Sequence, residues 1–206
     1  MRVLIAGFGP FPGAPFNPSA FLTAALARRR RPALAEIEIE SHVFATAYTA
    51  VDRDLRKLLA RKPDAVLIFG LAASRPHVYV ETRARNAVSL LSPDAIGRRP
   101  RRGTIDAGEP PSRTGNTPSA YLLNALRRSG VSARLSRDAG RYLCNYAYWR
   151  ALQHVEENRP LVQFVHVPRV ATKARRGTFK HRRPSLARLT AAAENLLIAL
   201  AAASRR

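Results

Sequence analysis

The stretch Ala65-Val66-Leu67-Ile68-Phe69-Gly70 is an unbroken apolar run that stops at a glycine, and it decides the expected fold. A short run that is apolar at every position is typical of a strand buried on both faces of a parallel sheet. Residues 2–7 and residues 161–167 are mostly apolar as well. These three segments therefore predict the central strands of one sheet.

Segments with helical periodicity separate these strands. Val51, Leu55, Leu58 and Leu59 recur at helical spacing within residues 48–62. Other helices are predicted over residues 17–29, 116–129 and 144–157 and from residue 184, and other strands over residues 36–40, 78–81 and 131–136. The alternation predicts an α/β fold, namely a single-domain three-layer sandwich over residues 1–206, with a twisted, mostly parallel sheet and helices on both faces.

Length and composition limit the class of protein. The chain has 206 residues, 46% hydrophobic and 24% charged, which is ordinary for one globular domain. No apolar run approaches the ~18–20 residues that cross a bilayer. The apolar start, residues 1–7, is too short for a signal peptide and lacks a cleavage pattern. We therefore expect a cytoplasmic protein with no membrane partner.

Cysteine and histidine usage argues against metal chemistry. Cys144 is the single cysteine, which excludes an internal disulfide and a zinc site of several thiolates. The five histidines are scattered, without the spacing of metal ligands. We therefore expect neither a metal nor a cofactor.

The formal net charge of +21 raises nucleic acid as a partner. The basic residues are nearly all arginines, spread over the ends of predicted helices and over loops, and include runs at 28–31, 98–102 and 169–183. This distribution favours compositional bias on a solvated surface. Non-specific attraction to polyanions would still follow from the charge.

Cys144 follows a predicted strand and a glycine-containing turn, which places it at the start of a helix. Unpaired backbone N–H groups and the helix dipole favour an anion there, so a thiolate is easier to form. The same N–H groups could hold the oxyanion of an acyl transfer. Alternatively, Cys144 is simply a small buried residue.

His166 and Glu81 could complete a thiol nucleophile. His166 ends an apolar strand, where an imidazole could take the thiol proton and later protonate a leaving amine. Glu81 could fix the imidazole tautomer. The alternatives are a structural histidine and a salt bridge from Glu81 to Arg83 or Arg85.

Two segments carry no decisive chemistry alone. The aromatic rings of Phe8 and Phe11, on a loop of glycine and proline, suit a pocket wall or core packing equally well. That loop lacks phosphate-loop spacing. Residues 92–113 form a long irregular loop, and such loops usually serve a site or move.

Four segments together resemble the pyroglutamyl peptidase I family of cysteine peptidases. These are Gly7-Phe8-Gly9-Pro10-Phe11-Pro12-Gly13 with Asn17-Pro18-Ser19, then Gly70-Leu71-Ala72 to Arg75 with Glu81 to Asn86, then Ala139-Gly140-Arg141-Tyr142-Leu143-Cys144-Asn145, and Phe164-Val165-His166-Val167-Pro168. Their order and spacing span most of the chain.

The resemblance implies a Cys144–His166–Glu81 triad that removes an N-terminal pyroglutamyl residue from peptides through a thioester, without a metal. Bacterial members of the family often form homo-oligomers, so the resemblance also implies a possible homo-oligomer here. By the same resemblance, the residues that line the lactam pocket are Phe8, Phe11, Asn17, Leu71, Tyr142 and Leu143. Aromatic walls suit a small, flat, uncharged ring.

The chain departs from the family pattern near the expected pocket. Leu71 stands where the family presents a glutamine amide, and the other departures are Gly9, Pro12, Ala73, Ser74, Thr82 and Arg85. A lost polar contact to substrate costs about 1–3 kcal/mol. A thiol amidohydrolase of the same fold with altered specificity is therefore the alternative, followed by a basic protein that associates with nucleic acid.

Overall fold

The computed structural model describes residues 1–11, 13–157, 159–171 and 183–205. One sheet has the strand order β2-β1-β3-β8-β4-β7. Its strands are β1 (Arg2–Phe8), β2 (Glu38–Phe44), β3 (Ala65–Leu71), β4 (Val78–Glu81), β7 (Ala133–Ser136) and β8 (Leu161–Val167). The three apolar runs of the sequence form the adjacent strands β1, β3 and β8, which confirms that they are central.

Strand direction brings two distant segments together. β1, β2, β3 and β8 are mutually parallel, β4 runs antiparallel to β8, and β7 is parallel to β4. In this register Gly70 lies beside His166 on one side, while Tyr79 lies beside it on the other. Glu81 pairs with Phe164, two residues before His166, so Glu81 and His166 are diagonal neighbours on one face of the sheet.

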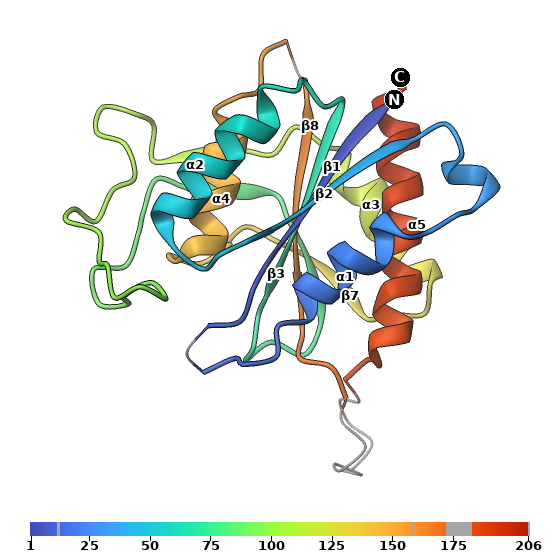
Figure 1. Cartoon of the computed structure of the whole chain (residues 1–206), viewed down its shortest axis with the longest axis horizontal. Helices are drawn as coiled ribbons and strands as arrows, with labels where there is room; N and C mark the ends of the chain where they lie inside the picture. Colours follow the sequence, from blue (N-terminus) through green and yellow to red (C-terminus); the bar gives the residue numbers. More distant parts are fainter. Residues whose placement is uncertain (12, 158, 172–182, 206) are drawn as a thin grey trace.

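Helices cover both faces of the sheet, as the alternation predicts. α1 (Pro18–Ala27), α3 (Ser119–Arg128) and α5 (Leu186–Ser204) lie on one side, and α2 (Tyr48–Leu59) and α4 (Leu143–Leu152) lie on the other (Figure 1). Val3 and Ile5 of β1 enter the first core, while Leu4 and Ala6 enter the second. This alternation of period two confirms a three-layer sandwich.

Several boundaries differ from the sequence expectation. β2 extends to Phe44 and starts at Glu38, and α4 ends at Leu152, about one turn before the predicted end. A short 3-10 helix, Pro32–Leu34, precedes β2. A two-stranded ribbon, β5 (Arg83–Arg85) with β6 (Ser112–Thr114), was not predicted, and it closes the base of the long loop.

α5 corrects the expectation that no segment could span a membrane. It has 19 residues and a mean hydropathy of 1.4, enough by length and composition, and 56% of this apolar window is buried inside the protein. Leu196, Leu197 and Leu200 pack in the core beside α1 and α3. The buried carboxylate of Glu194 pairs with Arg29 and Arg31, so α5 has the contacts of a core helix.

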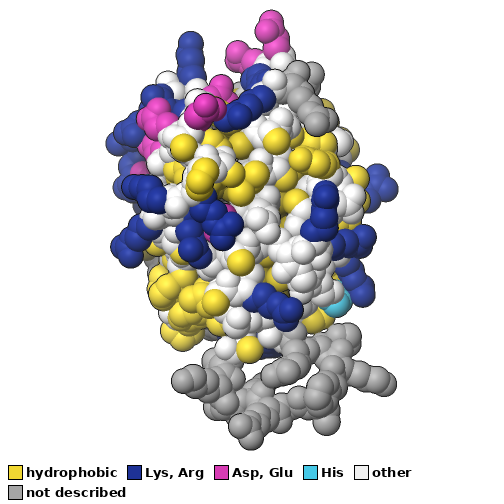
Figure 2. All heavy atoms as spheres, turned by 90° about the vertical axis from the view of Figure 1, so that its right-hand side faces the viewer, with side chains coloured by type: hydrophobic (Ala, Val, Ile, Leu, Met, Phe, Trp, Pro, Cys, Tyr) yellow, Lys and Arg dark blue, Asp and Glu magenta, His cyan; other side chains and the backbone are white. Residues whose placement is uncertain are grey.

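The positive charge is dispersed on the face that carries α1, α3 and α5. Figure 2 shows lysine and arginine side chains scattered around this face, with the acidic side chains gathered at one end. Part of the basic run at 169–183 falls on residues 172–182, outside the described residues. A scattered pattern on this face does not trace a continuous track for a nucleic-acid backbone.

Candidate active site

A turn that needs glycine leads into the helix carrying Cys144. Gly140 has a φ of 83°, in the left-handed region that favours glycine, and its N–H donates to Asp138 Oδ1. Tyr142 is the N-cap of α4 and makes no side-chain capping bond. Cys144 is therefore the second residue of a helix whose first N–H groups remain available, as its sequence position predicts.

His166 and Glu81 form a buried hydrogen-bonded pair. His166 Nδ1 lies 2.9 Å from Glu81 Oε1, and the two residues are 6% and 0% exposed. Because Nδ1 faces Glu81, Nε2 is the ring nitrogen left for the thiol of Cys144. The antiparallel β4–β8 pair creates this contact, and it does not depend on sequence proximity.

Cys144 reaches the imidazole because the neighbouring strand leaves room for it. A Cβ added at Gly70, the residue paired with His166, would lie 2.7 Å from Cys144 Sγ and 2.7 Å from the Phe164 ring. Real Cβ atoms do not approach so closely, so glycine is required at this position. Cys144 is a free thiol and is partly exposed, unlike a cysteine that only fills the core.

Electrostatics favour a charged imidazole beside the thiol. Burial, the largest influence, lowers the pKa of His166. The attraction of Cys144 and its hydrogen bond raise it, and so does Glu81, with a net pKa of about 9. An imidazolium therefore persists at neutral pH beside the Cys144 sulfur.

Further contacts hold Glu81 in place. Its backbone carbonyl accepts hydrogen bonds from Gln163 Nε2 at 2.9 Å and from the Tyr148 hydroxyl at 3.1 Å. Arg75 Nη1 lies 3.7 Å from Glu81 Oε1 and its guanidinium stacks on Tyr79. Arg75 is therefore the arginine that forms an ion pair with Glu81. The alternative of a salt bridge from Glu81 to Arg83 or Arg85 is wrong, because Arg83 donates to a backbone carbonyl and Arg85 pairs with Asp138.

The loop after β1 brings three of the predicted pocket residues to the carboxyl end of the sheet. Phe8 is 3% exposed, and its ring lies 5.6 Å from that of Phe44, so it packs largely in the core. Phe11 is partly exposed and pairs with Ala14 across a tight turn. Pro12 lies outside the described residues.

Asn17 has its whole amide engaged inside the protein. It caps α1 by accepting from the Ser19 N–H and hydroxyl, and its Nδ2 donates to the Gly9 carbonyl at 3.0 Å. Asn17 therefore shapes the loop that carries Phe8 and Phe11. Gly9 also donates to Phe44, and its carbonyl accepts from Thr46, so the loop is fixed at several points.

The other three predicted pocket residues differ in exposure. Leu71 ends β3 and is 9% exposed, while Leu143 begins α4 and is 1% exposed within the core. Tyr142 is partly exposed, and its hydroxyl donates to the Pro93 carbonyl at 2.9 Å. Of the six predicted residues, Phe11 and Tyr142 have the most surface available to a ligand.

Two departures from the family pattern have structural partners. Thr82 Oγ1 donates to the Ser136 carbonyl at 3.0 Å, which ties β4 to the end of β7. Arg85 forms an ion pair with Asp138 at 3.4 Å. Neither side chain contacts the Glu81–His166 pair in any described bond.

Asn145 has a role that local patterns did not predict. Its amide receives the Arg85 N–H and donates to the carbonyls of Arg85 and Ala87, at 2.8–2.9 Å. These bonds fasten the first turn of α4 to the chain after β5. The asparagine directly after the cysteine in the third motif is the only sequence signal for this role.

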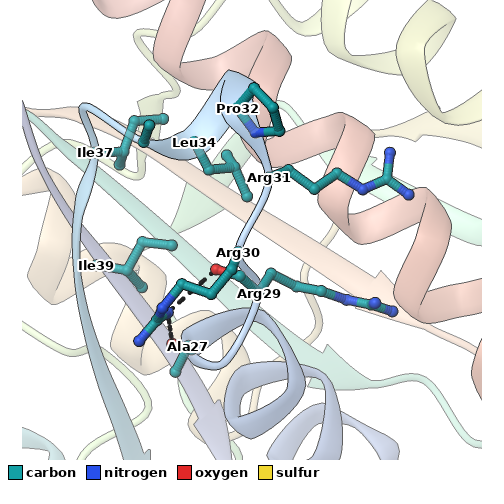
Figure 3. Close-up of a pocket in the computed structure, with 9 residues that line it drawn as sticks. Ala27, Arg29, Arg30, Arg31, Pro32, Leu34, Ile37 and Ile39 are labelled. Carbon is teal, nitrogen blue, oxygen red and sulfur yellow. Dashed lines mark hydrogen bonds between the residues drawn. The ribbon is translucent and has the colours of Figure 1, made fainter.

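Of two hollows on the described surface, one lies near the candidate site and one lies away from it. One of about 330 Å³ is lined by Tyr48, Tyr146 and residues of the long loop. The other, of about 490 Å³, lies between the end of α1 and the start of β2, where Leu34, Ile37 and Ile39 meet a run of arginines (Figure 3). Among the described residues, no cluster of His, Cys, Asp or Glu could hold a metal ion.

Comparisons with known proteins identify the family of the chain. The family model described as pyroglutamyl peptidase matches residues 1–206. Pyrrolidone-carboxylate peptidases from Thermococcus kodakarensis and Gloeobacter violaceus are 32% and 30% identical over 82% and 84% of this chain, and over 81% and 84% of their own lengths.

Solved structures give the same result. A pyrrolidone carboxyl peptidase mutant from Pyrococcus furiosus matches with a TM-score of 0.87 at 26% identity, over 99% of this chain and 100% of its own. The enzyme from Thermococcus litoralis matches with a TM-score of 0.85 at 27% identity, over 98% and 93%. The chain therefore belongs to the pyroglutamyl peptidase family, a family of enzymes.

Proposed function

We propose that this protein is a cysteine peptidase that releases N-terminal pyroglutamate from peptides, with Cys144 as nucleophile, His166 as acid and base, and Glu81 as the orienting carboxylate. The observation that carries the assignment is the Glu81–His166 hydrogen bond of 2.9 Å, with Cys144 on the other side of the ring. One domain over residues 1–206 carries the site.

The first half of the reaction is acyl transfer to sulfur. The Cys144 thiolate attacks the carbonyl carbon of the pyroglutamyl residue, and the resulting oxyanion is stabilised by N–H groups of the first turn of α4. The His166 imidazolium then protonates the leaving amine as the C–N bond breaks. The products of this half are a shortened peptide and a pyroglutamyl thioester.

The second half regenerates the thiol. The neutral imidazole takes a proton from water, the hydroxide adds to the thioester carbonyl, and the C–S bond breaks to release pyroglutamate. Glu81 stays ionised and stabilises the imidazolium each time it forms. The bonds from Gln163 and Tyr148 fix the backbone carbonyl of Glu81, and His166 and Arg75 contact its carboxylate.

The proposed lactam pocket combines Phe11 and Tyr142, which are partly exposed, with Phe8, Leu71 and Leu143 behind them. Asn17 contributes by fixing the Gly9 carbonyl. The apolar surroundings suit an uncharged ring, and the main-chain groups of this loop can recognise a lactam.

Altered selectivity within the same chemistry is the second candidate. Leu71 offers no amide near the end of β3, so discrimination between pyroglutamyl and prolyl amides rests on fewer polar groups. A panel of pyroglutamyl, prolyl and acetylated amides separates the two candidates. Equal rates on all three would favour the second.

Three further proposals concern partners and location. Nucleic acid would associate only through non-specific attraction to the net charge of +21. A reactive thiol persists best in a reducing compartment, which supports a place in the cytoplasm. The likeness to bacterial members also supports a homo-oligomer.

The decisive experiment compares wild type with Cys144→Ala on a pyroglutamyl amide of a fluorescent amine. We expect wild-type turnover to stop on thiol alkylation, and a loss of more than about a thousandfold in the variant, because the nucleophile is gone. Circular dichroism and thermal melting confirm that the variant is folded. Thiol-independent turnover, or no turnover of any pyroglutamyl amide, would contradict the assignment.

A further inference from the structure

Four arginine side chains within five residues form no ion pair among the described residues, near the candidate active site. They are Arg98, Arg99, Arg101 and Arg102, which we call the arginine loop, and all four are exposed. Every Asp and Glu of the chain lies in the described residues, and none forms an ion pair with this loop.

The acids closest to the loop in the chain and around its hollow are already engaged. The Asp94 carboxylate accepts the N–H groups of Tyr48, Ile96 and Arg98 at 2.8–3.2 Å. Asp106 accepts from Trp149, Arg150 and Gln153. Asp52 accepts from the Tyr146 hydroxyl and pairs with Arg150.

These bonds hold the arginine loop over a hollow. Its volume is about 330 Å³, at the lower end of the range for ligand sites, and the arginines share its lining with Tyr48 and Tyr146. The Tyr48 hydroxyl oxygen is buried and has no hydrogen-bond partner among the described residues. A carboxylate in this hollow would receive hydrogen bonds from one or two of the exposed guanidinium groups and would lie against the tyrosine rings.

Tyrosine rings connect the hollow to the segment that carries Cys144. The Tyr48 ring lies 5.0 Å from that of Tyr146 and 6.1 Å from that of Tyr142. Tyr142 is two residues before Cys144, which limits their Cα separation to about 7 Å. An extended peptide advances about 3.3–3.6 Å per residue, so a few residues reach from the thiol around Tyr142 to the hollow.

The site loop and the arginine loop are also fastened to one another. The Thr46 hydroxyl donates to the carbonyls of Gly9 and Pro10, and the Thr46 carbonyl accepts the Ala95 N–H at 2.8 Å. Thr46 thus joins the loop of the lactam pocket to the segment that leads into the arginine loop. Their relative position is therefore fixed by direct bonds.

We propose that the arginine loop is a subsite for the leaving part of the substrate, and that it selects peptides with Asp or Glu within the first few residues after pyroglutamate. The proposal rests on the proposed function, because it concerns the same substrate. Guanidinium groups match carboxylates in geometry and charge.

The test measures kcat/KM for pyroglutamyl peptides that differ only in the three residues after pyroglutamate: all neutral, two acidic, or two basic. Exposed charge pairs contribute little each, so we expect the acidic peptide to be favoured over the neutral one by about three- to tenfold at low salt. The basic peptide should be disfavoured, and the preference should shrink in 0.5 M salt, where the Debye length is only a few Å.

Two matched variants locate the effect. Replacing Arg98, Arg99, Arg101 and Arg102 by Gln should bring the ratio of acidic to neutral kcat/KM to about one. The control replaces four exposed arginines elsewhere, Arg28, Arg30, Arg128 and Arg134, which removes the same net charge and should keep the ratio. Equal loss in both variants would place the effect in the overall charge and overturn the proposal.

The peptide preference of the wild type tests the arginine-loop subsite even if a variant does not fold. Turnover of the fluorescent amide without any preference for acidic peptides overturns this inference and leaves the proposed function standing. No turnover of either substrate class overturns the proposed function itself. Inhibition by an RNA oligomer that disappears in the arginine-loop variant, without a preference for acidic peptides, would assign the loop to nucleic acid instead.

Discussion

The proposed triad and the long loop after β5 use charge in opposite ways. At the triad, Glu81 and His166 are buried and bonded to one another, and Cys144 lies beside them, so every charge has a partner. In the loop, the Asp94 and Asp106 carboxylates accept hydrogen bonds from within the protein. The four arginines of the arginine loop are exposed and form no ion pair with any described residue. We therefore assign catalysis to the first region and substrate selectivity to the second.

This contrast has an energetic basis. A buried charge must be paired. Removing either Glu81 or His166 therefore leaves the remaining charge buried without a partner, which costs free energy. An exposed arginine can be replaced with little effect on folding. We therefore expect changes at the triad to affect turnover severely, whereas changes in the loop affect selectivity mildly.

The largest effect within this comparison is expected for Glu81→Gln. The amide preserves the size of the side chain but cannot stabilise an imidazolium, and it can hold the ring in the wrong tautomer. We expect kcat/KM to fall by about 10²–10⁴-fold while the fold is kept. Glu109→Gln is a suitable control, since its carboxylate forms only a surface pair with Arg113. Turnover within threefold of wild type would remove Glu81 from the mechanism.

A second prediction concerns pH. Turnover should decline as the pH rises through about 9, since the imidazolium that protonates the leaving amine is then lost. In Cys144→Ala, burial is opposed by Glu81 alone, so the pKa of His166 should fall. An NMR titration of the histidine rings measures this shift, and an unchanged pKa would contradict the Cys144–His166 contact.

The same pKa gives a prediction for stability. An unfolded histidine titrates near 6.5, and His166 is raised above that value in the folded protein. Its stabilising contribution is therefore fully present below about pH 6.5 and is lost as the pH rises through about 9. Denaturation midpoints of wild type and His166→Gln should converge above pH 9, and a constant difference would contradict this.

The smallest effect is expected at the anchor of the loop. Asp94→Asn replaces a carboxylate that accepts three backbone N–H groups, so we expect the free energy of unfolding to drop by about 1–3 kcal/mol. Chemical denaturation measures the change, and Glu109→Gln again serves as control, with a loss below about 1 kcal/mol. Equal losses in both variants would mean that Asp94 does not anchor the loop.

Much of the fold could be predicted from the sequence, because the buried parallel strands β1, β3 and β8 are mostly apolar. The antiparallel direction of β4 could not, because it arises from how the chain returns to the sheet, which local patterns do not record. The ribbon of β5 and β6 was missed because Arg83-Ala84-Arg85 has no apolar face to signal a strand.

The candidate site likewise has features that the sequence predicts and features that it does not. Helix-start placement of Cys144 and strand-end placement of His166 follow from local patterns, and Glu81 came mainly from the family resemblance. The engagement of the Asn17 amide, the space left by Gly70 and the unpaired Tyr48 hydroxyl depend on tertiary contacts between distant segments. No periodicity or spacing in the sequence could indicate them.

Cys144 is the only sulfhydryl in the chain, and it is partly exposed. A colorimetric thiol titration of purified protein therefore counts the proposed nucleophile directly, one per polypeptide, without background from other cysteines. The same property leaves the protein without a second thiol to react first, so we expect oxidation of this one sulfur to abolish the proposed activity completely.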